Sequence, residues 1–298
     1  MDWKQKARYK YTVATMAEKL IIANVVVFVF FKVINVVGYL FQFPTEFIME
    51  WFVLPKEPME FIVQPWSIIT YAFLHQGFFH LLSNVIVLYF AGKIFHTYYN
   101  GKRLLNYYFL GAIVGGLLYL LSYNLFPAFT QLGNSYLLGA SAGVMAVLVG
   151  ITTYVPNMPV RLFIFGNLKL WYITAVLVVL DVIQIPLGNA GGHIAHLGGA
   201  FLGYFYTSQL QKGKDIGTGF EKLVDSVVNL FTFKKKSPLK TVHRTQKNST
   251  KRTSSVKNSS ASEQQQKIDA ILDKISKSGY DSLSKKEKDF LFNAGKDS

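Results

Sequence analysis

Residues 139–156 read GASAGVMAVLVGITTYVP, an apolar run that opens with small residues and contains no charged side chain. Such a run predicts a membrane-spanning helix, because a helix that is apolar all round must be buried in protein or lipid. From Ser141 to Pro156 a helix rises about 22 Å, which is short of a hydrocarbon core of about 30 Å. Ser141 is therefore expected below one membrane surface, where the missing turns leave room for water.

The composition also favours a membrane protein. Of 298 residues, 51% are hydrophobic and 16% are charged, whereas a soluble domain carries about 25% charged residues. Cysteine is absent, which excludes disulfide scaffolds, thiolate nucleophiles and cysteine-ligated metal centres. The expected fold class is an all-α membrane protein.

Five further stretches are apolar enough to cross a bilayer, for which about 20 residues of helix are needed. The six predicted spans are residues 20–40, 78–98, 104–126, 140–156, 168–186 and 193–210. We expect these spans to pack as one six-helix bundle, which makes residues 20–210 the membrane domain.

Basic residues predict the orientation of the bundle, because short loops rich in Lys and Arg stay on the cytoplasmic side. Basic segments alternate with turns free of Lys and Arg, the basic ones being 1–19, 93–103 and 157–170 and the free ones 127–138 and 187–192. Both termini are therefore expected to be cytoplasmic. The loop 41–65 is rich in aromatic residues and is expected to lie in the outer leaflet.

The polar C-terminal region is expected to have two parts. Residues 211–265 are rich in Lys, Ser, Thr and Gln, a composition typical of a disordered linker. Residues 266–298 predict a small helical hairpin, with a break at Gly279 and a capping box from Ser284 to Glu287. The basic tail beyond the last span favours anionic lipid headgroups over nucleic acid as its partner.

Three groups of polar residues stand in the predicted spans, where unsatisfied polar groups are costly and are functional candidates. They are the pentad Gly139-Ala140-Ser141-Ala142-Gly143, the pair His80 and Asn84, and the pair His193 and His196. Taken alone, the pentad is better explained by close helix packing than by catalysis. The orientation above, however, places all three groups in the outer part of outside-to-inside spans, so we expect them at one depth.

These residues suit acyl transfer. A serine needs a neighbouring base to accept its proton, and His196 can serve Ser141 if the two helices approach closely, as the small residues Gly199 and Gly203 allow. His80, Asn84 and the Ser141 amide can donate to an oxyanion. Asp181 is the only acid between Glu60 and Asp215. We interpret it as a structural hydrogen-bond acceptor and expect a Ser-His dyad.

At this point the chain resembles the rhomboid family of intramembrane serine proteases, of the bacterial six-span type with a short C-terminal extension. The matching motifs are G-x-S-x-G at 139–143, His80-Leu-Leu-Ser-Asn84, and His196-x-x-Gly199-x-x-x-Gly203. The resemblance implies that Ser141 is the nucleophile and His196 the base, with His80, Asn84 and Gly139 around the oxyanion.

The resemblance also implies what such an enzyme acts on and where. Its partners would be single-span or membrane-anchored protein substrates, cut near the non-cytoplasmic face. It would be a multi-pass protein of a bacterial cytoplasmic membrane that needs neither a cofactor nor a metal.

Some positions depart from the family pattern. The family often has Trp-Arg before the second span, where this chain has Trp66-Ser67. An aromatic residue that often stacks on the base is Met145 here, and a frequent Glu-x-Arg pair aligns with His96 and Tyr98. His193 competes with His196 as the base, but only His196 has the glycines three and seven residues later.

Three rival functions remain. A catalytic metal at the histidines would usually need a Glu base, which does not accompany them, and activity that survives a chelator would exclude it. A catalytically inactive rhomboid-like protein that binds transmembrane helices would usually lack the Ser or the His. A transporter would be expected to show an internal repeat, and none is visible.

Overall fold

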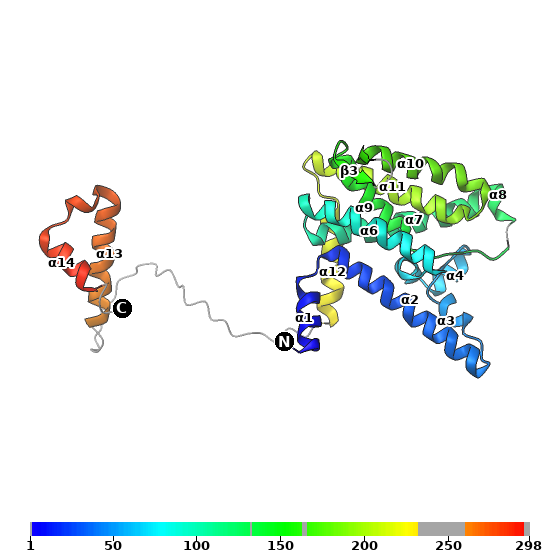
Figure 1. Cartoon of the computed structure of the whole chain (residues 1–298), viewed down its shortest axis with the longest axis horizontal. Helices are drawn as coiled ribbons and strands as arrows, with labels where there is room; N and C mark the ends of the chain where they lie inside the picture. Colours follow the sequence, from blue (N-terminus) through cyan, green and yellow to red (C-terminus); the bar gives the residue numbers. More distant parts are fainter. Residues whose placement is uncertain (1, 132, 163–165, 232–259, 295–298) are drawn as a thin grey trace, which may run out of the picture. The chain divides into compact units, whose positions relative to one another are not determined.

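The computed structural model describes residues 2–131, 133–162, 166–231 and 260–294 and divides into two compact units. The first unit, Met1–Lys234, contains all the stretches predicted to span a membrane (Figure 1). The second unit, Lys235–Ser298, contains the C-terminal helices.

Every stretch predicted as a span is helical. The six helices are α2 (Met16–Phe41), α6 (Phe78–Tyr98), α7 (Gly101–Leu125), α9 (Ser141–Tyr154), α10 (Leu170–Gln184) and α11 (Ala190–Gln211). Within the described residues, α2, α6, α7 and α10 with its continuation η2 (Ile185–Leu187) are long and apolar enough to cross a membrane, and α9 is a shorter apolar helix. The chain is therefore a multi-pass membrane protein.

Helix α9 lies at the centre of the first unit, against α6, α7, α10 and α11 (Figure 1). Ten of its 14 residues are buried. At the periphery, α2 buries only four of its 26 residues. A helix too short to cross the hydrocarbon is tolerated at the centre because neighbouring helices, rather than lipid, surround its ends.

Glycines on α11 bring it into contact with the backbone of α9. A β-carbon at Gly199 would collide with the carbonyl oxygen of Ala142, and one at Gly203 would collide with that of Ala146. Only glycine fits at either position without moving the helices apart. This close approach sets the distance between the start of α9 and the second turn of α11.

The loop 41–65 is folded against the segment that leads into α9. It contains α3 (Glu46–Glu50), β1 (Leu54–Pro55) and α4 (Pro58–Val63). Strand β1 pairs antiparallel with β2 (Tyr136–Leu137), so that Leu54 lies opposite Leu137. The Trp66 ring nitrogen donates to the carbonyl oxygen of Trp51 at 2.8 Å, and the two rings stack. Trp66 thus anchors this loop without the arginine that often follows it in the family.

A second support runs through α5 (Ser67–Thr70) and the turn η1 (Tyr71–Phe73). The Tyr71 hydroxyl donates to the Ala112 carbonyl of α7, and the Tyr108 hydroxyl donates to the Ala72 carbonyl, each at 2.7 Å. The carbonyl of Tyr71 in turn accepts from the Gly139 amide at 3.0 Å. The residues before α9 are therefore tied to α7 through satisfied, buried polar groups.

The remaining short elements of the first unit lie at the ends of the long helices. They are α1 (Trp3–Val13), α8 (Pro127–Thr130), and the antiparallel pair β3 (Pro159–Leu162) and β4 (Gly166–Lys169). Helix α2 begins with a capping box between Thr15 and Glu18. The His96 ring accepts from the Ala17 amide at 3.3 Å, so His96 helps to close the same helix end.

The expectation of a disordered linker over 211–265 is wrong for residues 217–231, which form helix α12 (Gly217–Phe231). Its apolar residues recur at helical spacing and give it one apolar face, which averaging the composition over the whole linker hides. Phe220 packs against Phe109 of α7. The expectation is also wrong for residues 260–265, which belong to helix α13 (Ser260–Ser278). Residues 232–259 lie outside the described residues.

A polar cluster attaches α12 to the bundle. Arg103 on α7 donates to the carboxylate of Asp215 at 3.1 and 3.2 Å, and the Tyr206 hydroxyl donates to the same carboxylate at 2.7 Å. The Asn106 amide donates to Glu221 on α12 at 2.7 Å. The cluster joins α7, α11 and α12 at one end of the bundle.

The second unit contains α13 (Ser260–Ser278), η3 (Tyr280–Ser282) and α14 (Lys285–Ala294). Gly279 separates the helices with a φ of 77°. The Ser284 amide donates to the Glu287 carboxylate at 2.7 Å, and the Glu287 amide donates to the Ser284 hydroxyl oxygen at 3.4 Å, which is the predicted capping box. Lys274 of α13 pairs with Glu287 at 3.0 Å.

Candidate active site

Ser141 is the first residue of α9 and follows the N-cap residue Ala140. Gly139 before it has a φ of 133°, a conformation that L side chains rarely adopt. A β-carbon at Gly139 would also lie 2.8 Å from Nε2 of His80. Glycine is therefore required here for its backbone conformation and for the space that the His80 ring occupies.

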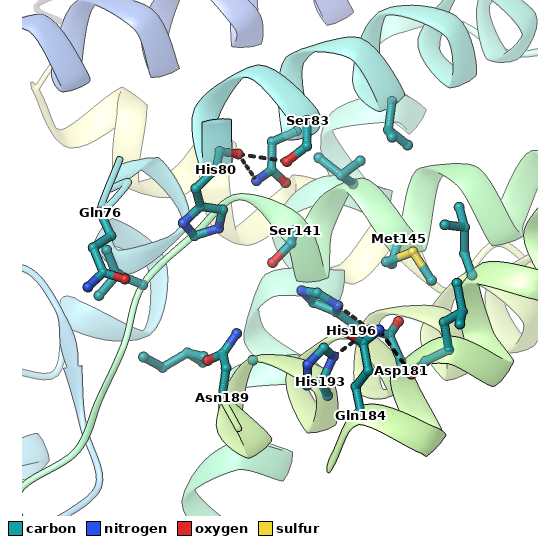
Figure 2. Close-up of a pocket in the computed structure, with 18 of the residues that line it drawn as sticks. Gln76, His80, Ser83, Ser141, Met145, Asp181, Gln184, Asn189, His193 and His196 are labelled. Atoms are coloured by element: carbon teal, nitrogen blue, oxygen red, sulfur yellow. Dashed lines mark hydrogen bonds and ion pairs between the residues drawn. The ribbon is translucent and has the colours of Figure 1, made fainter. Parts of the chain in front are cut away.

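His196 comes from the second turn of α11. Figure 2 shows the Ser141 side chain between the rings of His80 and His196, with both rings turned toward the same cavity. Ser141 and His196 are both half-buried. The structure thus brings the predicted serine and histidine to one place.

His80 and Asn84 lie on one face of α6 and line the same cavity. The Asn84 amide donates to the His80 carbonyl at 2.8 Å, and the Ser83 hydroxyl donates to the same oxygen at 3.0 Å (Figure 2). One hydrogen of the Asn84 side-chain amide is therefore used in a hydrogen bond within α6. The His80 ring packs edge-on against the His75 ring, with centroids 5.1 Å apart.

Asp181 on α10 contacts two histidines, a pairing that the sequence did not predict. Its Oδ1 atom lies 2.7 Å from Nδ1 of His196 and 2.8 Å from Nδ1 of His193 (Figure 2). From the sequence, Asp181 was expected to be a structural hydrogen-bond acceptor outside a Ser-His dyad. The chain turns between α10 and α11 at Gly188. Asp181 lies seven residues before Gly188 and His196 lies eight residues after Gly188. Antiparallel pairing of the two helices about this turn could therefore have predicted that Asp181 and His196 lie close together.

The cavity around these residues measures about 960 Å³. Its polar wall carries the serine, the histidines and Asp181, together with Gln184 and Asn189. Its apolar wall includes residues of α6, α9 and α10, namely Val87, Val144, Met145, Leu177 and Leu180, and Met49, Leu137 and Leu138 also line the cavity. Met145, which replaces the family's aromatic residue, thus lines the same cavity as His196.

Among the described residues, Asp181, His193 and His196 form the one group of His, Asp and Glu side chains that could hold a metal ion. One ligand atom each of Asp181, His193 and His196 lies within 4.8 Å of the other two. Both histidine nitrogens are already within hydrogen-bond distance of the carboxylate, so a proton on each accounts for the arrangement without a cation.

Comparison with known families gives two matches. The rhomboid domain family matches residues 63–212, which include every site residue described above. A family of unknown function (DUF6576) matches residues 256–293, which cover most of the second unit.

Several curated proteins are similar to this chain. RHOMBOID-like protein 12, mitochondrial, of Arabidopsis thaliana is 28% identical over 205 residues, which are 65% of this chain and 58% of that protein. Presenilin-associated rhomboid-like protein A, mitochondrial, of Danio rerio is 32% identical over 144 residues, 45% of this chain and 35% of that protein. Rhomboid protein 1, mitochondrial, of Saccharomyces cerevisiae is 29% identical over 178 residues, 58% of this chain and 49% of that protein. The chain thus spans between 35% and 58% of the length of these relatives.

Proposed function

Because the chain belongs to the rhomboid family, we propose that it is an intramembrane serine endopeptidase with Ser141 as nucleophile and His196 as general base. The observation that carries this proposal is the position of Ser141, at the start of a short buried helix and facing His196 across a cavity.

The first half of the reaction forms an acyl-enzyme. Nδ1 of His196 is engaged by Asp181, which leaves Nε2 to accept the Ser141 proton as Oγ attacks the substrate carbonyl carbon. The tetrahedral intermediate collapses by breaking the C–N bond, and His196 returns the proton to the leaving amine. In the second half, a water molecule gives a proton to His196 and attacks the ester carbon. The second tetrahedral intermediate collapses by breaking the C–O bond to Ser141, and His196 returns the proton to Oγ as the carboxyl product leaves.

The oxyanion of each tetrahedral intermediate needs donors in a dry site, each worth about 3–4 kcal/mol. The backbone N–H of Ser141 is one, because amides in the first turn of a helix have no acceptor within it. The His80 ring and the second amide hydrogen of Asn84 supply the others. Because Gly139 has no side chain, the His80 ring can lie against it and close to Ser141.

The proposed substrates are single-span or membrane-anchored proteins. The apolar wall of the cavity suits a segment that arrives from lipid, and the polar wall satisfies its backbone once the helix unwinds. The alternation of basic loops supports six spans with both termini cytoplasmic, which would place the cut near the non-cytoplasmic face.

A bacterial cytoplasmic membrane is the proposed location, and only the resemblance of the C-terminal extension supports it. The relatives described above are eukaryotic, and each carries "mitochondrial" in its name. Fractionation of the native organism, with detection of the chain in the cytoplasmic-membrane fraction, tests this part separately.

A fluorophosphonate probe tests the nucleophile. We expect it to label the purified wild-type chain and not Ser141→Ala, while Ser208→Ala near the far end of α11 is labelled like the wild type. If wild type and Ser141→Ala are both unlabelled although both are folded, the chain is instead an inactive relative that binds transmembrane helices.

Two histidine variants test the base. His196→Ala is expected to abolish cleavage, whereas His193→Ala should retain part of it because the nitrogen that serves Ser141 stays in place. Equal cleavage by His196→Ala and the wild type would end the assignment of the base. Cut sites in a library of single-span substrates, mapped by mass spectrometry, would then define the substrate class.

A further inference from the structure

The Asp181 carboxylate is the only acidic side chain between Glu60 and Asp215. It is buried on α10, one of the helices long and apolar enough to cross a membrane. A charged group in such a position is costly unless it is paired, and such residues are usually functional. The structure gives this carboxylate two partners, both of them histidines of the candidate active site.

The hydrogen-bond geometry defines which histidine nitrogens carry hydrogen. An ionised carboxylate only accepts hydrogen bonds. Since Oδ1 of Asp181 lies 2.7 Å from Nδ1 of His196 and 2.8 Å from Nδ1 of His193, both Nδ1 atoms must be donors. A neutral His196 with its hydrogen on Nδ1 has its lone pair on Nε2. Figure 2 shows the His196 ring between Ser141 and Asp181, so the lone pair faces the serine side.

The position of Asp181 is set independently of the histidines. Two turns earlier on α10, the Thr174 hydroxyl lies 2.7 Å from the Thr152 hydroxyl of α9, and both side chains are buried. This contact fixes α10 against α9, and η2 then turns the chain into α11. Asp181 is thus presented to His196 by the packing of α10.

We propose that Asp181 is a positioning residue for His196, so that the site works as a Ser141–His196–Asp181 chain rather than as a dyad. This inference rests on the proposed function. Asp181 holds the His196 ring in the tautomer that can accept the serine proton. His193, as the second donor to the same oxygen, keeps that oxygen oriented.

The same carboxylate stabilises the charge that develops during the reaction. When His196 takes the serine proton it becomes a cation beside a cavity wall of Val144, Met145 and Leu177. A cation next to apolar groups is unfavourable, whereas one that is hydrogen-bonded to a buried carboxylate is stabilised without any rearrangement of solvent.

Asp181→Asn tests the proposal, because asparagine keeps the shape but presents an amide that can donate to Nδ1. That donation favours the tautomer with hydrogen on Nε2, which cannot accept the serine proton. We expect the rate of fluorophosphonate labelling to fall by about 10²–10⁴-fold. Peptide cleavage should show the loss in kcat, with KM changed by less than about threefold.

Thr174→Val is the matched control on the same helix. It removes a buried hydrogen bond between α10 and α9 but leaves Asp181 and the histidines untouched. We expect it to lower the melting temperature at least as much as Asp181→Asn does, yet to keep the labelling rate within about threefold of the wild type. An equal loss of labelling in both variants would mean that Asp181 only docks α10, and would overturn the proposal.

Imidazole ¹⁵N resonances give a second readout that does not depend on activity or on the fold of Asp181→Asn. They are recorded in full-length Ser141→Ala, with His196 assigned by comparison with the double variant Ser141→Ala, His196→Gln. Hydrogen on Nδ1 of His196 supports the proposal, and hydrogen on Nε2 overturns it. Failure of the proposed function would appear differently, as probe labelling of Ser141→Ala or as its absence in the folded wild type.

Discussion

Gly139 shows how much of the site depends on a single residue. Its amide is bonded to the Tyr71 carbonyl, its φ is 133°, and its missing side chain leaves room for the His80 ring. Backbone, loop and candidate catalytic side chains therefore meet at this glycine. A substitution there affects conformation and space at the same time.

Gly139→Ala is expected to reduce fluorophosphonate labelling by at least about 100-fold, because the added methyl displaces the His80 ring, and an oxyanion donor is worth about 3 kcal/mol. Gly188→Ala is the matched control, since Gly188 has a φ of 139° but nothing within 4 Å of its β-carbon position. Both variants should lose about 1–3 kcal/mol of stability from backbone strain. Equal labelling of the two would contradict the role assigned to the space beside His80.

Single residues were predicted unequally well from sequence. Ser141 and His196 stand in short motifs whose spacing identifies them as candidates, and the structure brings them to one cavity. Asp181 belongs to no motif, and its role depends on how two helices pair about Gly188. Treating each span separately, as the sequence analysis did, loses that information.

At the scale of elements, the contact between α9 and α11 determines the site. The two helices meet through Gly199 and Gly203, where carbonyl oxygens of α9 occupy the places that side chains would fill. Backbone atoms cannot move aside as a flexible side chain can. The helices would therefore have to separate to accept even one methyl group.

Gly199→Ala is expected to cost about 1–3 kcal/mol of stability and to abolish most labelling, because moving α11 outward withdraws His196 from Ser141. Gly219→Ala on α12, where nothing lies within 4 Å of the β-carbon position, is the control. That variant should melt at or above the wild-type temperature, because alanine favours a helix. A wild-type melting temperature and labelling rate for Gly199→Ala would refute the close contact.

The attachment of α12 predicts a pH dependence. Burial raises the pKa of the Asp215 carboxyl, but hydrogen bonds from Tyr206 and Arg103 outweigh burial and hold that pKa below its ordinary value of 3.8. A lowered pKa in the folded state means that the ionised form is bound more favourably there. The resulting stability is present above about pH 4 and is lost as the pH falls through the folded-state pKa.

Asp215→Asn should therefore melt about 2–4 °C below the wild type at pH 7, for an interaction of about 1 kcal/mol. The difference should shrink as the pH is lowered below 4 and vanish once the wild-type carboxyl is protonated. Melting curves of both chains in the same detergent between pH 3 and pH 7 measure it. A difference that stays constant across this range would show that the charge of Asp215 contributes nothing.

At the scale of the whole molecule, the apolar pattern predicted the helices well and their surroundings poorly. The six predicted spans all fall on helices, because apolar runs of this length have few other stable forms. The folding of loop 41–65 onto β2 and the helix α12 were not predicted. Both depend on partners distant in sequence or on periodicity within a region that is polar on average.

The proposed topology can be tested directly because the chain contains no cysteine. Lys102→Cys, Gln131→Cys and Lys214→Cys place single thiols in three exposed positions. With six spans and cytoplasmic termini, a membrane-impermeant maleimide should label only Gln131→Cys in intact cells and all three after permeabilisation. Labelling of Lys102→Cys before permeabilisation would contradict the proposed orientation.

If the chain is the protease proposed above, the shortness of α9 lets the thickness of the membrane influence where a substrate is cut. Its 14 residues rise about 21 Å, so Ser141 stays at a depth that the protein sets, whatever the surrounding membrane. A substrate helix instead takes its depth from the lipid, and each change of about 1.5 Å in membrane thickness moves it by about one residue. One substrate would therefore be cut at neighbouring peptide bonds in membranes built from short and from long acyl chains.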